Sequence, residues 1–123
     1  MQSNPVGWFE IYVQNMNRAK AFYESVFDMQ LQKLDATELD MWAFPMMKDK
    51  TGASGALVKM DGVNSGGNST IVYFMCSDCG NEAAKVTKAG GRVHKGKMSI
   101  GQYGFIALVQ DTEGNTFGLH SMK

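Results

Sequence analysis

The chain has 123 residues, the size of one ordinary domain that can bury its own core. Twelve basic residues balance twelve acidic residues, so there is no net charge to attract nucleic acid or an anionic membrane surface. No apolar run is long enough to cross a bilayer, and the first residues lack the pattern of a signal peptide. Two cysteines are too few for a disulfide framework, and ten methionines suit a reducing compartment, so we expect a cytoplasmic protein.

The first half of the chain predicts a strand, a helix and three further strands. Residues 7–14 alternate, with apolar side chains on one side of the expected strand. The other side carries three larger side chains with polar atoms, namely Trp8, Glu10 and Tyr12. Asn15 or Asn17 can cap a helix over 18–27, where apolar residues recur at helical spacing. The further strands are expected at 31–34, 41–47 and 55–60.

The second half repeats this order after a loop over 62–69 that is rich in Gly, Asn and Ser. A strand is expected at 70–76, followed by a helix over 82–89 that Ser77 or Asp78 can cap. Three more strands are expected at 92–95, 104–110 and 115–121. A repeat of element order predicts two similar modules, which would pair to enclose a shared cleft.

Four segments carry a resemblance to a known family. They are WFEIYVQNMNRAKAFY at 8–23, VFD at 26–28, KAGG at 88–91 and ALVQDTEGN at 107–115. In this order and spacing, the chain resembles the vicinal-oxygen-chelate superfamily, which includes glyoxalase I, extradiol dioxygenases and bleomycin-resistance proteins. The resemblance implies an α+β fold in which two paired β-α-β-β-β modules form a curved mixed sheet with a concave cleft, and it implies a homodimer. The single domain 1–123 would then comprise module one at 1–61, the loop at 62–69 and module two at 70–123.

The metalloenzymes of this family hold a divalent ion at four strand positions. Carried over by the resemblance, these positions are Trp8, Gly55, Ile71 and Gly118. None of the four side chains offers a nitrogen or oxygen donor for a divalent cation, and a shift by one residue in either direction restores no site. We therefore predict no metal and no cofactor, and we do not expect metal-dependent glyoxalase or dioxygenase activity.

The same alternation predicts which side chains line a ligand-binding cleft. The expected ligand-binding residues are Trp8, Glu10, Tyr12, Tyr73 and His120. An aromatic wall with a few polar groups is typical of a small-molecule site. Glu10 and His120 are the best candidates for acid–base catalysis. The alternative is that both are ordinary polar side chains paired with neighbours.

Three other features have a structural and a functional interpretation. The pair Cys76 and Cys79 has the spacing of a redox or zinc motif, but we favour a buried cysteine followed by one at a helix start. The segment 92–103 is either a solvated loop between strands or a flap with basic residues over the cleft. The methionine-rich group around 41–47 is expected in a core or dimer seam rather than on an adaptable binding surface.

The leading hypothesis is a metal-free protein that sequesters or senses a small organic compound. The first alternative is a lyase or isomerase that acts on a small carbonyl compound without metal. The second is a module that binds a protein partner through exposed apolar surface.

Overall fold

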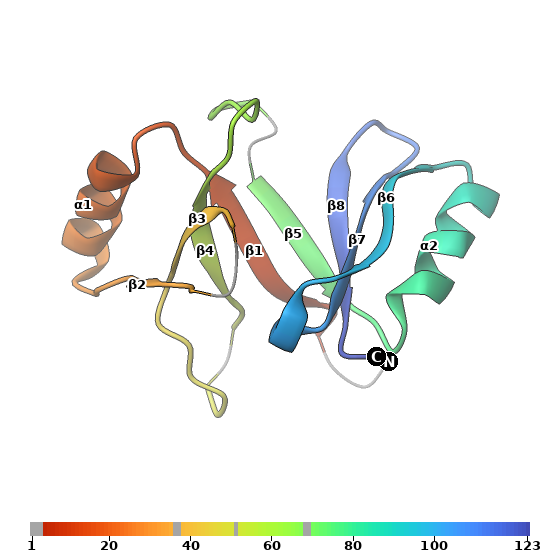
Figure 1. The fold of residues 1–123 in the computed structure, drawn as a ribbon, viewed down its shortest axis with the longest axis horizontal. Helices are drawn as coiled ribbons and strands as arrows, with labels where there is room; N and C mark the ends of the chain where they lie inside the picture. The colour runs from red at the N-terminus through yellow and green to blue at the C-terminus, as the bar shows by residue number, and fades with distance from the viewer. Residues whose placement is uncertain (1–3, 36–37, 51, 68–69) are drawn as a thin grey trace. The chain divides into compact units, whose positions relative to one another are not determined.

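The structure is a computed structural model that describes residues 4–35, 38–50, 52–67 and 70–123. The chain forms two compact units, one of Trp8–Thr70 and the other of Met1–Gly7 with Ile71–Lys123. Each unit combines one helix with a four-stranded mixed sheet (Figure 1). The repeated β-α-β-β-β order predicted from the sequence is therefore confirmed.

The unit Trp8–Thr70 has the strand order β2-β3-β4-β1. Its elements are β1 (Val6–Tyr12), α1 (Met16–Phe27), β2 (Gln32–Lys33), β3 (Asp40–Ala43) and β4 (Ser54–Lys59). Strand β1 runs parallel to β4, and β3 runs antiparallel to both β4 and β2. A parallel neighbour needs a long connection, and α1 with β2 and β3 supplies it.

Helix α1 begins at a side-chain cap and ends at a residue in the left-handed conformation. Asn15 has extended backbone angles and its side chain accepts a hydrogen bond from the Arg18 amide at 3.0 Å, so Asn15 is the cap. Asp28 ends the helix in the left-handed conformation, with a φ of 52°. The helix packs on one face of the sheet through a buried cluster of Val13, Met16, Leu31 and Leu57.

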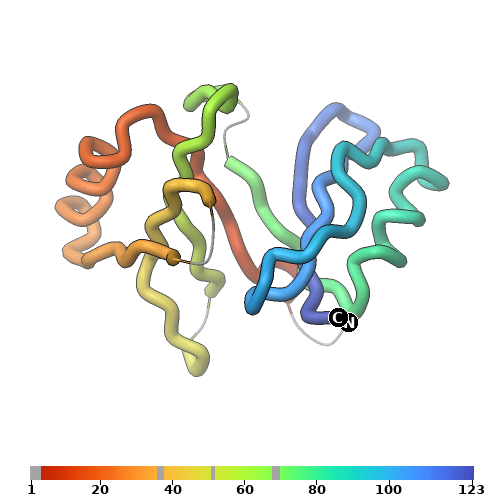
Figure 2. Tube along the Cα trace, viewed as in Figure 1, coloured from red at the N-terminus to blue at the C-terminus, as the bar shows by residue number. Residues whose placement is uncertain are grey.

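The second unit has the strand order β5-β8-β7-β6. Its elements are β5 (Thr70–Met75), α2 (Cys79–Lys88), β6 (Arg92–Ser99), the short 3₁₀ helix η1 (Gly101–Tyr103), β7 (Phe105–Gln110) and β8 (Thr116–Ser121). Strand β8 is parallel to β5 and antiparallel to β7, and β7 is antiparallel to β6. Helix α2 packs beside β6, β7 and β8 (Figure 2). Cys79, Ala107 and Val109, each 0% exposed, lie at the centre of this core.

Most of the segment 92–103 is a strand, which corrects its interpretation as a loop or a flap, and residues 100–103 form the turn that follows this strand. Residues Arg92–Ser99 form the edge strand β6, and all eight are exposed. Two irregularities in its pairing with β7 and the charges of Arg92, Lys95 and Lys97 protect this edge against pairing with another chain. A strand exposed on both faces has no apolar alternation, so its full length was not visible in the sequence.

Helix α2 starts at Cys79 and its cap is Asp78, whose side chain accepts a hydrogen bond from the Gly80 amide at 3.0 Å. The same carboxylate binds the Lys97 ammonium of β6 at 2.9 Å. The hydrogen bond from Lys97, and then the one from Gly80, holds the pKa of Asp78 below its usual value. A carboxyl whose pKa is lower in the folded chain stabilises the fold above its unfolded-state pKa, and this contribution is lost as the pH falls.

We expect Lys97→Met to raise the pKa of Asp78 towards its usual value and so to reduce the loss of stability on acidification. A carboxyl NMR titration of the two proteins measures this directly. Asp111 is the internal control, because backbone and side-chain hydrogen bonds from Asn115 lower its pKa without Lys97. An unchanged pKa of Asp78 in Lys97→Met would show that the contact with Lys97 is too transient to affect that carboxyl.

None of the helices in the described part of the chain has the length and apolarity that a bilayer crossing requires.

Candidate functional site

The face of β1 that points away from α1 carries a cluster of three side chains joined by hydrogen bonds. The Tyr12 hydroxyl donates to Glu10 Oε1 at 2.9 Å, and the Trp8 indole N–H donates to Glu10 Oε2 at 3.3 Å. Alternating residues of a strand share a face, which explains why positions 8, 10 and 12 meet. The cluster therefore presents a carboxylate whose two oxygens are each held by an aromatic donor.

The Glu10 carboxylate is unusually buried for a charged group. Its residue is 9% exposed, and it lies opposite Ala56 of β4, which is 0% exposed. Burying a carboxylate is costly unless hydrogen bonds compensate, and Trp8 and Tyr12 supply two of them. A buried acid held in a fixed position can accept a hydrogen bond from a ligand or a proton from a reacting carbon.

Tyr12 is the stronger of the two donors and stays neutral. Burial, followed by the negative charge of Glu10 and the hydrogen bond to it, raises the pKa of Tyr12 well above its usual value. The phenol therefore remains a hydrogen-bond donor to Glu10 at every physiological pH.

We expect Glu10→Gln to lower the pKa of Tyr12 while leaving it above the usual tyrosine value, because burial remains. The measurement is an alkaline titration of tyrosinate absorbance, with Tyr12→Phe used to assign the signal among the four tyrosines. If the titration of Tyr12 does not change in Glu10→Gln, the two side chains do not interact as described.

The second unit places Tyr73 and His120 on the face of its sheet that points away from α2. Tyr73 pairs with Gly118, and Met75 pairs with His120, in the parallel register of β5 and β8. The Tyr73 ring covers Gly118 so closely that an added Cβ would lie 2.3 Å from two ring carbons. Tyr73 is 4% exposed, so its ring fills the space where a larger side chain at 118 would project.

His120 is held through one ring nitrogen. Its Nε2 lies 2.6 Å from the carbonyl oxygen of Tyr103. A carbonyl oxygen only accepts, so Nε2 carries the proton in this hydrogen bond and Nδ1 is the nitrogen left for other chemistry.

The four strand positions carried over from the metalloenzymes do not fit a divalent ion. Trp8, Ile71 and Gly118 have no suitable donor, and the Tyr73 ring occupies the space beside Gly118. In the residues that the structure describes, no group of three or more His, Cys, Asp or Glu is arranged to hold a metal ion.

The assignment of Gly55 to one of these positions was wrong by one residue. Gly55 pairs with Phe9, and the Phe9 ring contacts Phe44 on the side of the sheet that α1 covers. Because strand side chains alternate, Gly55 points away from the face that carries Glu10. The residue on that face is Ala56, the partner of Glu10, and its methyl group cannot coordinate a metal either.

Both cysteines are free thiols inside the second unit. Cys79 is 0% exposed in the core beneath α2, and Cys76 packs against the same core. Burial, and then the Glu82 carboxylate, raises the pKa of the Cys76 thiol, so it is protonated at neutral pH and is a poor nucleophile. These positions agree with a structural role for the pair.

Residues 6–119 match the model of the glyoxalase/bleomycin resistance protein/dioxygenase superfamily. The chain belongs to this superfamily. Its fold is also similar to a methylmalonyl-CoA epimerase variant from Streptomyces coelicolor in complex with 2-nitronate-propionyl-CoA, with a TM-score of 0.69, 16% identity and 96% of each chain covered. A methylmalonyl-CoA epimerase from Mycobacterium tuberculosis gives a TM-score of 0.66 at 12% identity, covering 100% of this chain and 93% of that one.

A hypothetical protein from Bacillus halodurans gives a TM-score of 0.71 at 11% identity, covering 99% of this chain and 96% of that one. No curated protein sequence matches the chain. The folds of these structures agree with the α+β fold predicted from the sequence. Identities this low show the fold alone, so the activity has to be argued from the side chains.

Proposed function

We propose that this superfamily member binds a small organic compound without a metal ion, to sequester or sense it. The proposed ligand-binding residues are Trp8, Glu10 and Tyr12 in the unit Trp8–Thr70 and Tyr73 and His120 in the second unit, each set on the sheet face opposite its own helix. The buried Glu10 carboxylate carries the proposal, because its burial is costly and its Trp8 and Tyr12 partners hold it in one position.

We propose binding without a metal because of the side chains at the strand positions where the related metalloenzymes carry their metal ligands. Tyr73 covers Gly118, and Ala56 stands opposite Glu10, where a metalloenzyme needs donor atoms. A ligand would therefore be held by hydrogen bonds and aromatic contacts rather than through a cation.

The structural neighbours suggest which compounds to try first. One of them is bound to 2-nitronate-propionyl-CoA and another to methylmalonyl-CoA, so acyl thioesters are the first ligand class to test. Both compounds carry carbonyl or nitronate oxygens that need hydrogen-bond donors. The indole N–H of Trp8, whose hydrogen bond to Glu10 is long at 3.3 Å, is a donor of that kind.

A thermal-shift screen of the purified chain tests the proposal, with acyl thioesters and a small-molecule library in one arm and divalent metals or EDTA in the other. A compound at ~100-fold above its dissociation constant should stabilise the fold by about 2.7 kcal/mol. We expect organic compounds to stabilise the chain equally with and without EDTA. Strong stabilisation by nickel, zinc or manganese alone would contradict the proposal.

Variants locate the binding groups. Glu10→Gln should abolish most of the ligand-induced shift, and Glu113→Gln is the matched control because Glu113 is exposed in the turn before β8. If the ligand raises the melting temperature of both variants equally, Glu10 is not part of the binding site. If no small molecule stabilises the chain, a protein-interaction module becomes the better interpretation.

A second candidate function is a metal-independent isomerase or lyase acting on a small carbonyl compound. Two observations favour it, namely the fixed Glu10 carboxylate and the fold shared with methylmalonyl-CoA epimerases. Glu10, or Nδ1 of His120, would remove a proton from the carbon beside the carbonyl and return the same proton to it. Exchange of that proton for deuterium in D₂O, with EDTA present, tests this activity. Glu10→Gln or His120→Ala should abolish the exchange. Full exchange in both variants would exclude Glu10 and His120 as the proton-transferring residues.

We also propose a homodimer in the cytoplasm. A formal net charge of +0 leaves little repulsion between copies, and both cysteines are free thiols. Light scattering on the purified chain tests the dimer; a monomer at all working concentrations would contradict it.

A further inference from the structure

A hollow at the start of α1 lies on the opposite side of β1 from the Glu10 cluster. It has a volume of about 340 Å³, and its lining includes the apolar side chains of Val13 and Ala19. The Phe22 ring, 59% exposed, forms part of its edge. A volume of this size is at the lower end for a small-molecule site.

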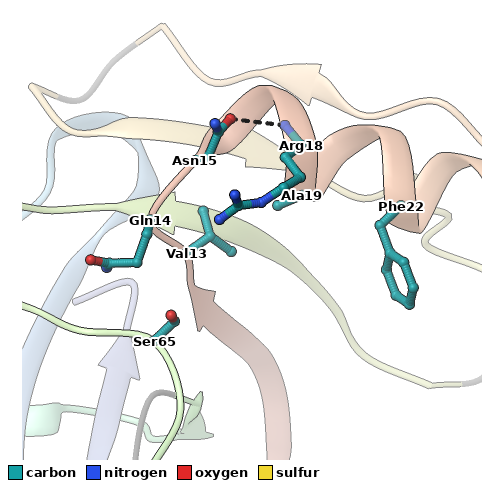
Figure 3. A pocket seen from close by; sticks show the side chains of 7 residues that line it. All are labelled: Val13, Gln14, Asn15, Arg18, Ala19, Phe22 and Ser65. Atoms are coloured by element: carbon teal, nitrogen blue, oxygen red, sulfur yellow. Dashed lines mark hydrogen bonds between the residues drawn. The ribbon is translucent and has the colours of Figure 1, made fainter.

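The polar edge of the hollow consists of Gln14, Asn15, Arg18 and Ser65. Figure 3 shows the Arg18 side chain extending back from the helix towards Val13 and Gln14. The Gln14 side chain donates to the Val63 carbonyl at 3.0 Å, which ties the end of β1 to the loop that carries Ser65. The hollow is therefore assembled from two segments about fifty residues apart, and its shape is held by a hydrogen bond between them.

The lining of the hollow carries a positive charge and no negative charge. Arg18 is the cation in its lining, and no carboxylate lines it. Within the described residues, the Arg18 guanidinium makes no hydrogen bond or ion pair; its backbone amide is the group that Asn15 caps. A guanidinium without an acceptor, beside apolar side chains and an exposed ring, matches a carboxylate attached to an apolar body.

We propose that this hollow is a binding site for a small carboxylate with an aromatic or branched apolar body. The carboxylate pairs with the Arg18 guanidinium, and the apolar body lies on Val13 and Ala19 against the Phe22 ring. The site is separate from the proposed function, because Val13 and Ala19 belong to the α1 side of β1 and Glu10 belongs to the other side.

The test is an NMR titration with 3-phenylpropionate, followed through the backbone amides of residues 13–22, with 3-phenylpropionamide as the neutral comparison. We expect saturable shifts in these amides with the carboxylate and weak or no shifts with the amide. Arg18→Gln should weaken binding about tenfold, as expected for loss of a charge-assisted hydrogen bond. Phe22→Ala should also weaken it.

The matched control is Arg92→Gln, which removes the chain's other arginine from the exposed edge strand β6. Arg92→Gln should bind as wild type does. The proposal is overturned if 3-phenylpropionate gives no saturable shifts up to about 10 mM, if the amide binds equally well, or if both arginine variants lose affinity equally. Glu10→Gln distinguishes the two sites, since it should weaken only the ligand of the proposed function.

Discussion

Replacing Gly55 with alanine should lower the free energy of unfolding by about 3 kcal/mol, the upper end of what overpacking usually costs. A Cβ at this position would lie 2.2 Å from the Phe9 carbonyl oxygen and 2.7 Å from two carbons of the Phe9 ring. The carbonyl belongs to the backbone of β1, which is paired with β4, so it cannot move without disturbing the sheet. Gly55 is itself buried, which leaves no room for the strand to shift outwards.

Urea unfolding followed by tryptophan fluorescence measures this effect in the right unit, because both tryptophans, Trp8 and Trp42, lie within Trp8–Thr70. Gly96→Ala is the control. A Cβ at Gly96 meets no atom within 4 Å, and its backbone is not left-handed, so we expect a change within about 0.5 kcal/mol. Equal stability of Gly55→Ala and Gly96→Ala would mean that the close approach of Phe9 to Gly55 is wrong.

Much of this fold was predictable because its strands and helices carry local signals. The alternation along β1 placed Trp8, Glu10 and Tyr12 on one face, and Asn15 proved to be the cap of α1. Helix α2 begins at Cys79, three residues before the expected start, because its first turn is polar and its apolar periodicity starts later. Strand β6 exceeded its predicted length because no apolar pattern marks an exposed edge.

The details of the site depended on contacts that no single segment encodes. A shift of one residue at Gly55 moves a side chain to the other face of a strand, and the sequence alone did not fix the pairing of β1 with β4. The contact between the Tyr73 ring and Gly118 could not be predicted from the sequence either, because the two residues meet through strand pairing. No local sequence pattern marks the hollow beside Arg18 either, because Ser65 reaches it from a distant loop.

The largest functional consequence of these contacts concerns Gly118, and we expect Gly118→Ala to cost about 2 kcal/mol of unfolding free energy. The new Cβ would lie 2.3 Å from ring carbons of Tyr73, a side chain that is 4% exposed and has little space to rotate. Tyr73→Ala alone should cost about 3 kcal/mol, because it removes a buried ring. In that background the additional change Gly118→Ala should cost less than about 0.5 kcal/mol, since the clashing ring has gone.

The double-mutant cycle should therefore give a coupling of about 2 kcal/mol between positions 73 and 118, measured by guanidinium unfolding followed by circular dichroism. Additive effects would show that the ring does not limit what position 118 accepts. A coupling of the expected size would mean that one substitution cannot restore a coordinating side chain at 118, because Tyr73 already fills the space that it needs. Position 118 would then be closed to a coordinating side chain by packing as well as by the identity of its residue.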